Sequence, residues 1–124
     1  MKIAKLIFAF IFGVVLILGG IGHFANPEMY NPFIPEFLNA LAVNYLTGIV
    51  ELALGIGLFI PKLRRPSALG VFVLMVLFLP LHVMDAFMDE PAIGSKAAAY
   101  VRLPIQFVLI WLPLWIRGKR IEIS

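Results

Sequence analysis

Four long apolar runs, separated by short proline-rich or charged segments, constrain the fold more than any other feature of the sequence. Spanning a hydrocarbon core of about 30 Å takes roughly 20 apolar residues, so each run is long enough for one transmembrane helix. We predict helices over about residues 3–22, 43–60, 67–87 and 97–116. The fold class is therefore all-α, an integral membrane four-helix bundle, with residues 1–124 forming a single membrane domain.

The composition agrees with a bilayer as the solvent. Apolar residues make up 62% of the chain and charged residues only 14%, which does not suit a small domain in water. The chain has no cysteine, so it cannot form disulfides or perform thiol chemistry by itself. Its net charge of +3 comes from basic residues beside the apolar runs. Membrane orientation explains that placement, and we expect no nucleic-acid partner.

The connections between the runs differ in character. The segment from Phe24 to Asn39 holds three prolines among aromatic and aliphatic residues, so it is predicted to lie on the membrane interface as a short interfacial segment between the first two helices. A basic turn from Lys62 to Pro66 should join the second and third helices in a tight hairpin. A polar stretch from Met88 to Lys96 should precede the fourth helix.

Basic residues on alternate sides of the predicted helices set the orientation. One side carries Lys2, Lys5, Lys62, Arg64, Arg65, Arg117, Lys119 and Arg120, and the other carries Lys96 and Arg102. Because basic residues accumulate on the cytoplasmic side, both termini are predicted to be cytoplasmic. The expected location is a bacterial-type plasma (inner) membrane, with the lipid bilayer as the immediate partner.

Ionisable and amide side chains inside the predicted helices form a layer near the outer face. Such residues are costly in a membrane and therefore need a partner or a purpose. His82 and Asp85 are three residues apart, and Arg102 and Gln106 four apart, so each pair shares one helical face. The second helix adds an interior stripe, and the end of the first helix adds His23. The stripe consists of Asn44, Thr47, Gly48, Glu51 and Gly55, and its glycines would let a neighbouring helix approach closely.

Two interpretations of this layer stay open. It could be a structural network in which Arg102 neutralises Asp85 or Glu51. It could also be a pocket for a ligand, because two carboxylates, two imidazoles, a guanidinium and an amide exceed what one ion pair needs. A proton path is a third option, but the inner halves of the helices offer no group to continue it. We expect neither haem nor a metal: no further haem signature is present, and Arg102 would repel a cation.

Several short motifs resemble those of the DoxX family of small membrane proteins. They are Gly22-His23-Phe24-x-Asn26-Pro27, Gly48-x-x-Glu51-x-x-x-Gly55-x-Gly57, Pro61 before Arg64-Arg65, Pro80-x-His82 and Arg102-x-Pro104-x-Gln106. The resemblance extends over nearly the whole chain. It implies a four-helix membrane bundle, and it implies that the recurrent polar positions are His23, Asn26, Glu51, His82, Arg102 and Gln106. It also implies a link to quinone-dependent redox complexes.

The leading functional hypothesis is a membrane subunit that binds a quinone or similar amphipathic ligand and supports a redox complex. The predicted ligand-binding residues are His23, Asn26, Glu51, His82, Asp85, Arg102 and Gln106. An accessory subunit or binding protein is expected rather than a stand-alone enzyme. The alternative is a non-catalytic assembly protein whose polar network is structural. A third hypothesis is a sterol- or lipid-binding protein in which Glu51 or Asp85 works with His82 as an acid–base pair.

Overall fold

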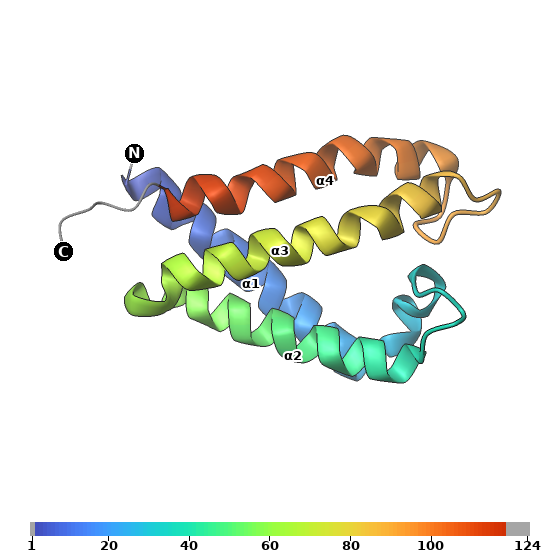
Figure 1. The fold of residues 1–124 in the computed structure, drawn as a ribbon, viewed down its shortest axis with the longest axis horizontal. Coiled ribbons are helices and arrows are strands. Elements are labelled where there is room, and N and C mark those ends of the chain that lie inside the picture. Colours follow the sequence, from blue (N-terminus) through green and yellow to red (C-terminus); the bar gives the residue numbers. More distant parts are fainter. Residues whose placement is uncertain (1, 119–124) are drawn as a thin grey trace.

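The computed structural model describes residues 2–118 and is built from helices (Figure 1). The long helices are α1 (Lys2–Ala25), α2 (Ala40–Phe59), α3 (Pro61–Ala86) and α4 (Lys96–Arg117), and two 3₁₀ turns, η1 (Pro27–Met29) and η2 (Asn31–Phe33), follow α1. No strand occurs among these residues. All 4 long helices have the length and hydropathy needed to cross a membrane. The predicted all-α four-helix membrane bundle is confirmed.

Helices α2 and α4 begin earlier than their apolar runs because polar residues cap them. The Asn39 side chain accepts a hydrogen bond from the Ala42 N–H group, and the Ser95 side chain accepts one from the Ala98 N–H group. Such side chains satisfy backbone donors that the first helical turn leaves free. Hydropathy alone therefore placed the start of the second helix three residues late.

The basic segment predicted as a turn is helical, which corrects the sequence interpretation. Helix α3 begins at Pro61, so only Ile60 separates it from α2. Proline suits the first helical position because its φ is already fixed and its missing N–H is not needed there. The Arg64 Nε donates to the Leu58 carbonyl oxygen over 2.7 Å, and its Nη2 donates to that of Phe59 over 3.3 Å. Arg64 thereby caps the last turn of α2.

Successive helices run in opposite directions, with α1 packed mainly on α2 and α3 mainly on α4. The described N-terminus, the α2–α3 connection and the end of α4 lie at one end of the bundle (Figure 1). Arg65 Nη1 donates to the carbonyl oxygens of Arg117 (2.6 Å) and Gly118 (3.2 Å) across this end. The 3₁₀ turns and the α3–α4 connection lie at the other end. Lys119 and Arg120, which the orientation count included, fall outside the described residues.

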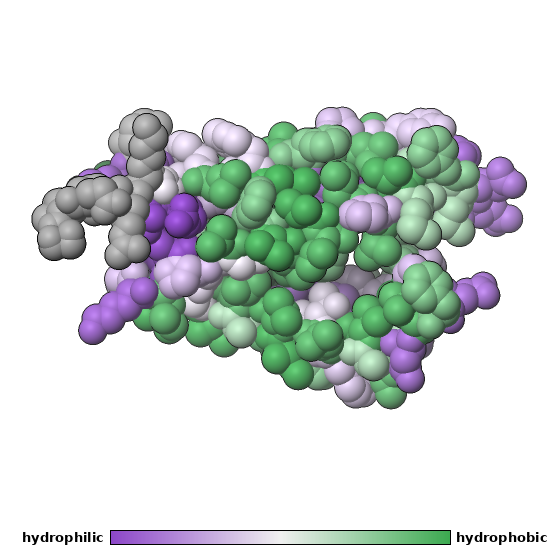
Figure 2. Space-filling view, viewed as in Figure 1, coloured by the Kyte–Doolittle hydropathy of each residue, from purple (hydrophilic) through white to green (hydrophobic). Residues whose placement is uncertain are grey.

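The two halves of the bundle differ in their interiors. The apolar core occupies the half near the described termini and consists of Ala9, Phe12, Leu16, Leu58, Ala68, Val71, Leu74, Met75 and Ile116. In the other half, the buried side chains include the polar residues His23, Asn44, Glu51 and Asp85. A hollow is visible there between the α1–α2 pair and the α3–α4 pair (Figure 2). The fold therefore places some of its buried polar residues, including His23 and Glu51, beside an open space.

Two glycine pairs bring the α1 and α2 backbones together. A β-carbon on Gly20 would lie 2.9 Å from the Gly48 carbonyl oxygen, and one on Gly55 would lie 2.9 Å from that of Gly13. Any side chain at these positions would push the helices apart. The predicted close approach at Gly48 and Gly55 is thus confirmed, and it is the small-residue packing typical of membrane helices.

Large apolar side chains cover the outside of all four long helices (Figure 2). Examples are Val15, Leu46, Leu77 and Val108, each more than half exposed. An apolar surface of this extent would be a liability in water but matches hydrocarbon. The protein is a multi-pass membrane protein.

Candidate functional site

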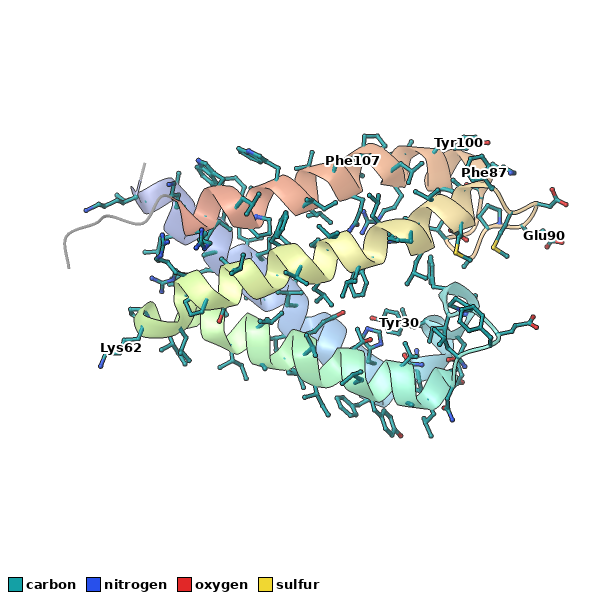
Figure 3. All side chains as sticks on the ribbon, in the orientation of Figure 1. Tyr30, Lys62, Phe87, Glu90, Tyr100 and Phe107 are labelled. Atoms are coloured by element: carbon teal, nitrogen blue, oxygen red, sulfur yellow. The ribbon has the colours of Figure 1, made fainter. Side chains whose placement is uncertain are left out.

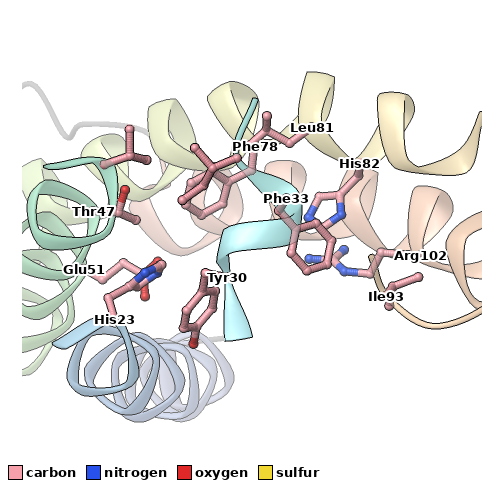
Figure 4. Close-up of a pocket in the computed structure, with 12 residues that line it drawn as sticks. His23, Tyr30, Phe33, Thr47, Glu51, Phe78, Leu81, His82, Ile93 and Arg102 are labelled. Atoms are coloured by element: carbon pink, nitrogen blue, oxygen red, sulfur yellow. The ribbon is translucent and has the colours of Figure 1, made fainter. Parts of the chain in front are cut away.

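A cavity of about 320 Å³ lies between the two helix pairs (Figure 4), at the end of the bundle far from the described termini. Its walls come from all four long helices, from η2 and from the α3–α4 connection. The lining residues are His23, Tyr30, Phe33, Ile34, Val43, Thr47, Glu51, Phe78, Leu81, His82, Ile93 and Arg102. Its size falls at the lower end of the range for small-molecule pockets.

Asn44 does not line the cavity, but it holds together the α1–α2 wall. Its side chain is fully buried, and its amide nitrogen lies 3.0 Å from Asn31 Oδ1, 3.1 Å from the Ala40 carbonyl oxygen and 3.4 Å from that of Pro27. Its amide oxygen lies 2.8 Å from His23 Nδ1. One asparagine therefore joins α1, both 3₁₀ turns and α2.

These contacts determine how many protons His23 and Glu51 share. The Asn44 amide nitrogen faces acceptors only, so its oxygen must face the ring, and His23 Nδ1 must carry a hydrogen. The other ring nitrogen, Nε2, lies 3.3 Å from Glu51 Oε2. That contact also needs a hydrogen, on either the ring or the carboxyl group, because two bare acceptors would repel. In either arrangement the His23–Glu51 pair holds one shared proton and has no net charge.

Packing holds this pair at the cavity wall. The Tyr30 ring stacks on the His23 ring with centroids 3.8 Å apart and planes inclined by 23°. Glu51 lies against the backbone at Gly19, where a β-carbon would come within 2.6 Å of its Oε1. Burial, and secondarily the nearby Glu51 carboxyl group, raise the pKa of Tyr30 above its usual 10.0. The Tyr30 hydroxyl thus remains a hydrogen-bond donor at physiological pH.

The α3–α4 wall carries His82 and Arg102, across the cavity from His23 and Glu51 (Figure 4). Phe33 of η2 meets the His82 ring edge-on, with centroids 5.9 Å apart and an interplanar angle of 66°. Arg102 Nη1 is buried and has no hydrogen-bond partner among residues 2–118. The side-chain ion pair formed among residues 2–118 is His23–Glu51, which does not involve Arg102. The expected pairing of Arg102 with Asp85 or Glu51 is therefore not formed.

Four of the predicted site residues, His23, Glu51, His82 and Arg102, line the cavity. The other three lie elsewhere. The Asp85 carboxylate accepts hydrogen bonds from the Ala92 and Ile93 N–H groups and so holds the α3–α4 connection. Gln106 is buried, and its Nε2 donates to the Met75 carbonyl oxygen over 2.6 Å. Asn26 is exposed and precedes η1 without a side-chain capping bond.

Several residues that shape the site were not among the predicted ligand-binding residues. Asn44 and Thr47 were on the predicted interior stripe, so their spacing from Glu51 could have placed them beside it. Tyr30, Asn31 and Phe33 gave no such signal. They lie in a proline-rich segment without helical periodicity, and only the folded 3₁₀ turns bring them over the cavity.

The helices and this cavity define a small multi-pass membrane protein with an amphipathic internal site. Within this class, the chain belongs to the family described as domain of unknown function (DUF8561), which matches residues 12–117. No curated protein and no solved structure matches the chain.

The family assignment overturns the resemblance to DoxX proteins. All the motifs that suggested DoxX lie between Gly22 and Gln106, within the residues matched by DUF8561. No DoxX family matches the chain. Glycines at helix contacts and isolated polar residues inside helices are common requirements of membrane bundles. Short motifs of these residue types therefore recur in unrelated families, which is why the resemblance was wrong.

Proposed function

We propose that this protein binds an amphipathic small molecule, such as a quinone, in the cavity. The observation that carries the proposal is the distribution of chemistry over the walls. Polar groups lie on two facing sides, His23 and Glu51 on one and His82 and Arg102 on the other. Apart from Tyr30 and Thr47, the rest of the lining is apolar and consists of Phe33, Ile34, Val43, Phe78, Leu81 and Ile93. Such pockets bind an apolar body and orient it through a few polar contacts.

The polar groups suit a ligand that carries hydrogen-bond acceptors. Arg102 can donate to a carbonyl oxygen of a quinone ring, and the aromatic rings of Phe33 and Phe78 can pack against the ring itself. On the opposite wall, the proton shared by His23 and Glu51 is available to a second ligand oxygen. Binding alone is proposed, which makes the protein an accessory or binding protein. A role in a redox complex depended on the DoxX resemblance and stays a prediction.

We also propose that the termini are cytoplasmic and that the cavity lies in the outer half of a bacterial-type inner membrane. The support is the gathering of Lys2, Lys5, Lys62, Arg64, Arg65 and Arg117 at the end of the bundle that holds the described termini. Basic residues concentrate on the cytoplasmic side of membrane proteins. The cavity is at the other end.

Binding of decylubiquinone to the detergent-solubilised protein tests the ligand proposal. We expect Arg102→Leu and Glu51→Gln each to weaken binding about tenfold or more, which corresponds to about 1.4 kcal/mol. Lys96→Leu is the matched control, because this basic residue in the first turn of α4 lies outside the cavity lining and donates to the Ala86 carbonyl oxygen. Equal affinity in the wild type and both cavity variants, measured by equilibrium dialysis, would rule out this site.

The assembly hypothesis is the second candidate, and the Asn44 network favours it. This network joins four segments through hydrogen bonds of one fully buried side chain, as a fixed scaffold for a partner protein would require. It predicts no bound small molecule and predicts that Glu51→Gln chiefly lowers thermal stability and partner recovery. A sterol- or lipid-binding role with Glu51 and His82 as an acid–base pair stays a prediction.

A further inference from the structure

The guanidinium group of Arg102 is a charge without a counter-ion. It lines the cavity, its Nη1 is buried without a hydrogen-bond partner, and no carboxylate within residues 2–118 lies within ion-pair distance. An arginine stays protonated in proteins. A charged group at membrane depth is costly and is normally paired. Arg102 therefore needs an anionic partner, and the described residues do not supply one in the cavity.

Neither carboxylate near the cavity can meet this requirement. Glu51 is paired with His23, and the pair has no net charge because it holds one shared proton. Asp85 is outside the cavity lining, and its carboxylate accepts the Ala92 and Ile93 N–H groups. Asp85 could leave Ala92 and Ile93 only by stranding their backbone donors.

The remaining polar neighbour on α4 is neutral. Gln106 lies one helical turn beyond Arg102, and its Oε1 is also buried without a partner in the described part of the chain. An amide oxygen can accept a hydrogen bond from a guanidinium group, but it cannot offset a full charge. The lining as a whole combines Arg102 with a neutral His23–Glu51 pair and therefore favours an anion.

We propose that the ligand of this cavity is an acidic amphiphile whose carboxylate or phosphate group binds Arg102. The inference rests on the proposed ligand-binding function and narrows its ligand class from amphipathic molecules in general to anionic ones. A guanidinium group matches carboxylate and phosphate oxygens in a two-point contact. The apolar part of the ligand would lie against Phe33, Phe78 and Leu81.

The cavity size sets how much of the ligand is enclosed. About 320 Å³ accommodates an acidic head and a short apolar portion, whereas the rest of a longer chain must extend through the hollow between the helix pairs (Figure 2). Two sources share this chemistry, a single-chain fatty acid and an anionic phospholipid that inserts its head. Both would place the acid at Arg102.

Competition among matched single-chain probes tests the inference. We would measure binding of laurate, methyl laurate and decylubiquinone to the delipidated protein in neutral detergent by native mass spectrometry. We expect laurate to bind at least tenfold more tightly than methyl laurate, which has the same chain without the charge. Arg102→Gln should remove this difference, Arg102→Lys should retain part of it, and the control Lys96→Gln should leave it unchanged.

The outcomes separate this inference from the proposed function. If decylubiquinone or methyl laurate binds as tightly as laurate, the protein binds amphiphiles but the acidic class is wrong. If none of the three binds, binding of phosphatidylglycerol is compared with binding of phosphatidylcholine. Selective binding of phosphatidylglycerol that is lost in Arg102→Gln supports a phospholipid as the ligand. Absence of binding by all five probes overturns both proposals. A preference for laurate that persists in folded Arg102→Gln protein also overturns the assignment to Arg102.

Discussion

At the scale of single residues, buried polar side chains have two different roles in this protein. Asn44 and Asp85 direct their hydrogen bonds to backbone or side-chain groups of the chain itself, and Gln106 does so through its Nε2. Within residues 2–118, Arg102 Nη1 and Gln106 Oε1 are buried without a hydrogen-bond partner. Because an unsatisfied buried group is expensive, the first kind stabilises the fold and the second kind marks a place where a ligand can contribute.

Asn44→Ala should be strongly destabilising. It removes the acceptor of His23 Nδ1 and the donor that serves Asn31 and the Ala40 and Pro27 carbonyl groups. Each buried group left unpaired costs about 1–3 kcal/mol, so the free energy of unfolding should fall by at least about 2 kcal/mol. Reversible unfolding in mixed micelles measures this change.

Asn26→Ala is the control for that measurement, because Asn26 is exposed and its side chain makes no capping bond. It should alter the free energy of unfolding by less than about 0.5 kcal/mol, as expected for a surface substitution. Equal losses in the two variants would contradict the role assigned to the Asn44 network.

At the scale of helices, the two pairs are held together by different means. Glycines bring α1 and α2 into backbone contact, whereas α3 and α4 are joined by side chains such as Gln106, which reaches the Met75 carbonyl oxygen. A close contact between helix backbones cannot be relieved by rotating a side chain, because the atoms that meet belong to the main chain. The α1–α2 pair is therefore the less tolerant of added volume.

Gly48→Ala should lower stability by about 1–3 kcal/mol through overpacking. Its new β-carbon would meet the Phe24 ring at 2.7 Å and the Gly20 carbonyl oxygen at 3.1 Å. Gly70→Ala in α3 is the matched control, since its β-carbon would meet only the tip of the Leu54 side chain, which can rotate away. Thermal unfolding in the same detergent compares them, and a larger loss for Gly70→Ala would refute this account of the α1–α2 contact.

At the scale of the whole molecule, the bundle is polarised along its axis. An apolar core and basic residues occupy the end with the described termini, and the cavity occupies the opposite end. Lys62 and Glu90 mark the two ends in Figure 3. This polarity is what gives the protein a preferred orientation in a membrane.

Single cysteines test that orientation directly, because the natural chain has none. Glu90→Cys should react with a membrane-impermeant maleimide added to intact bacterial cells, and Lys62→Cys should react only after the membrane is permeabilised. Lys62→Cys leaves the other basic residues at that end in place, so the orientation should not change. Labelling of Lys62→Cys in intact cells, with Glu90→Cys protected, would show the inverted orientation.

Much of the architecture was predictable from the sequence because hydropathy and helical spacing are local properties. The four apolar runs required four membrane helices, and the spacing of Gly48, Glu51 and Gly55 indicated which face of α2 turns inward. Helix ends were less predictable, since hydropathy does not report the capping side chains of Asn39 and Ser95 or the helix start that Pro61 provides.

The sequence by itself determined the membrane helices, their alternating direction and four of the residues that line the cavity. Only the tertiary structure decided which polar groups meet, because partners such as His23 and Asn44 are 21 residues apart and no local pattern connects them. It also assigned Asp85 to the α3–α4 connection, placed Tyr30 and Phe33 over the cavity, and left Arg102 Nη1 without a partner among residues 2–118. Pairing depends on how helices rotate and pack against one another, and that information exists only in three dimensions.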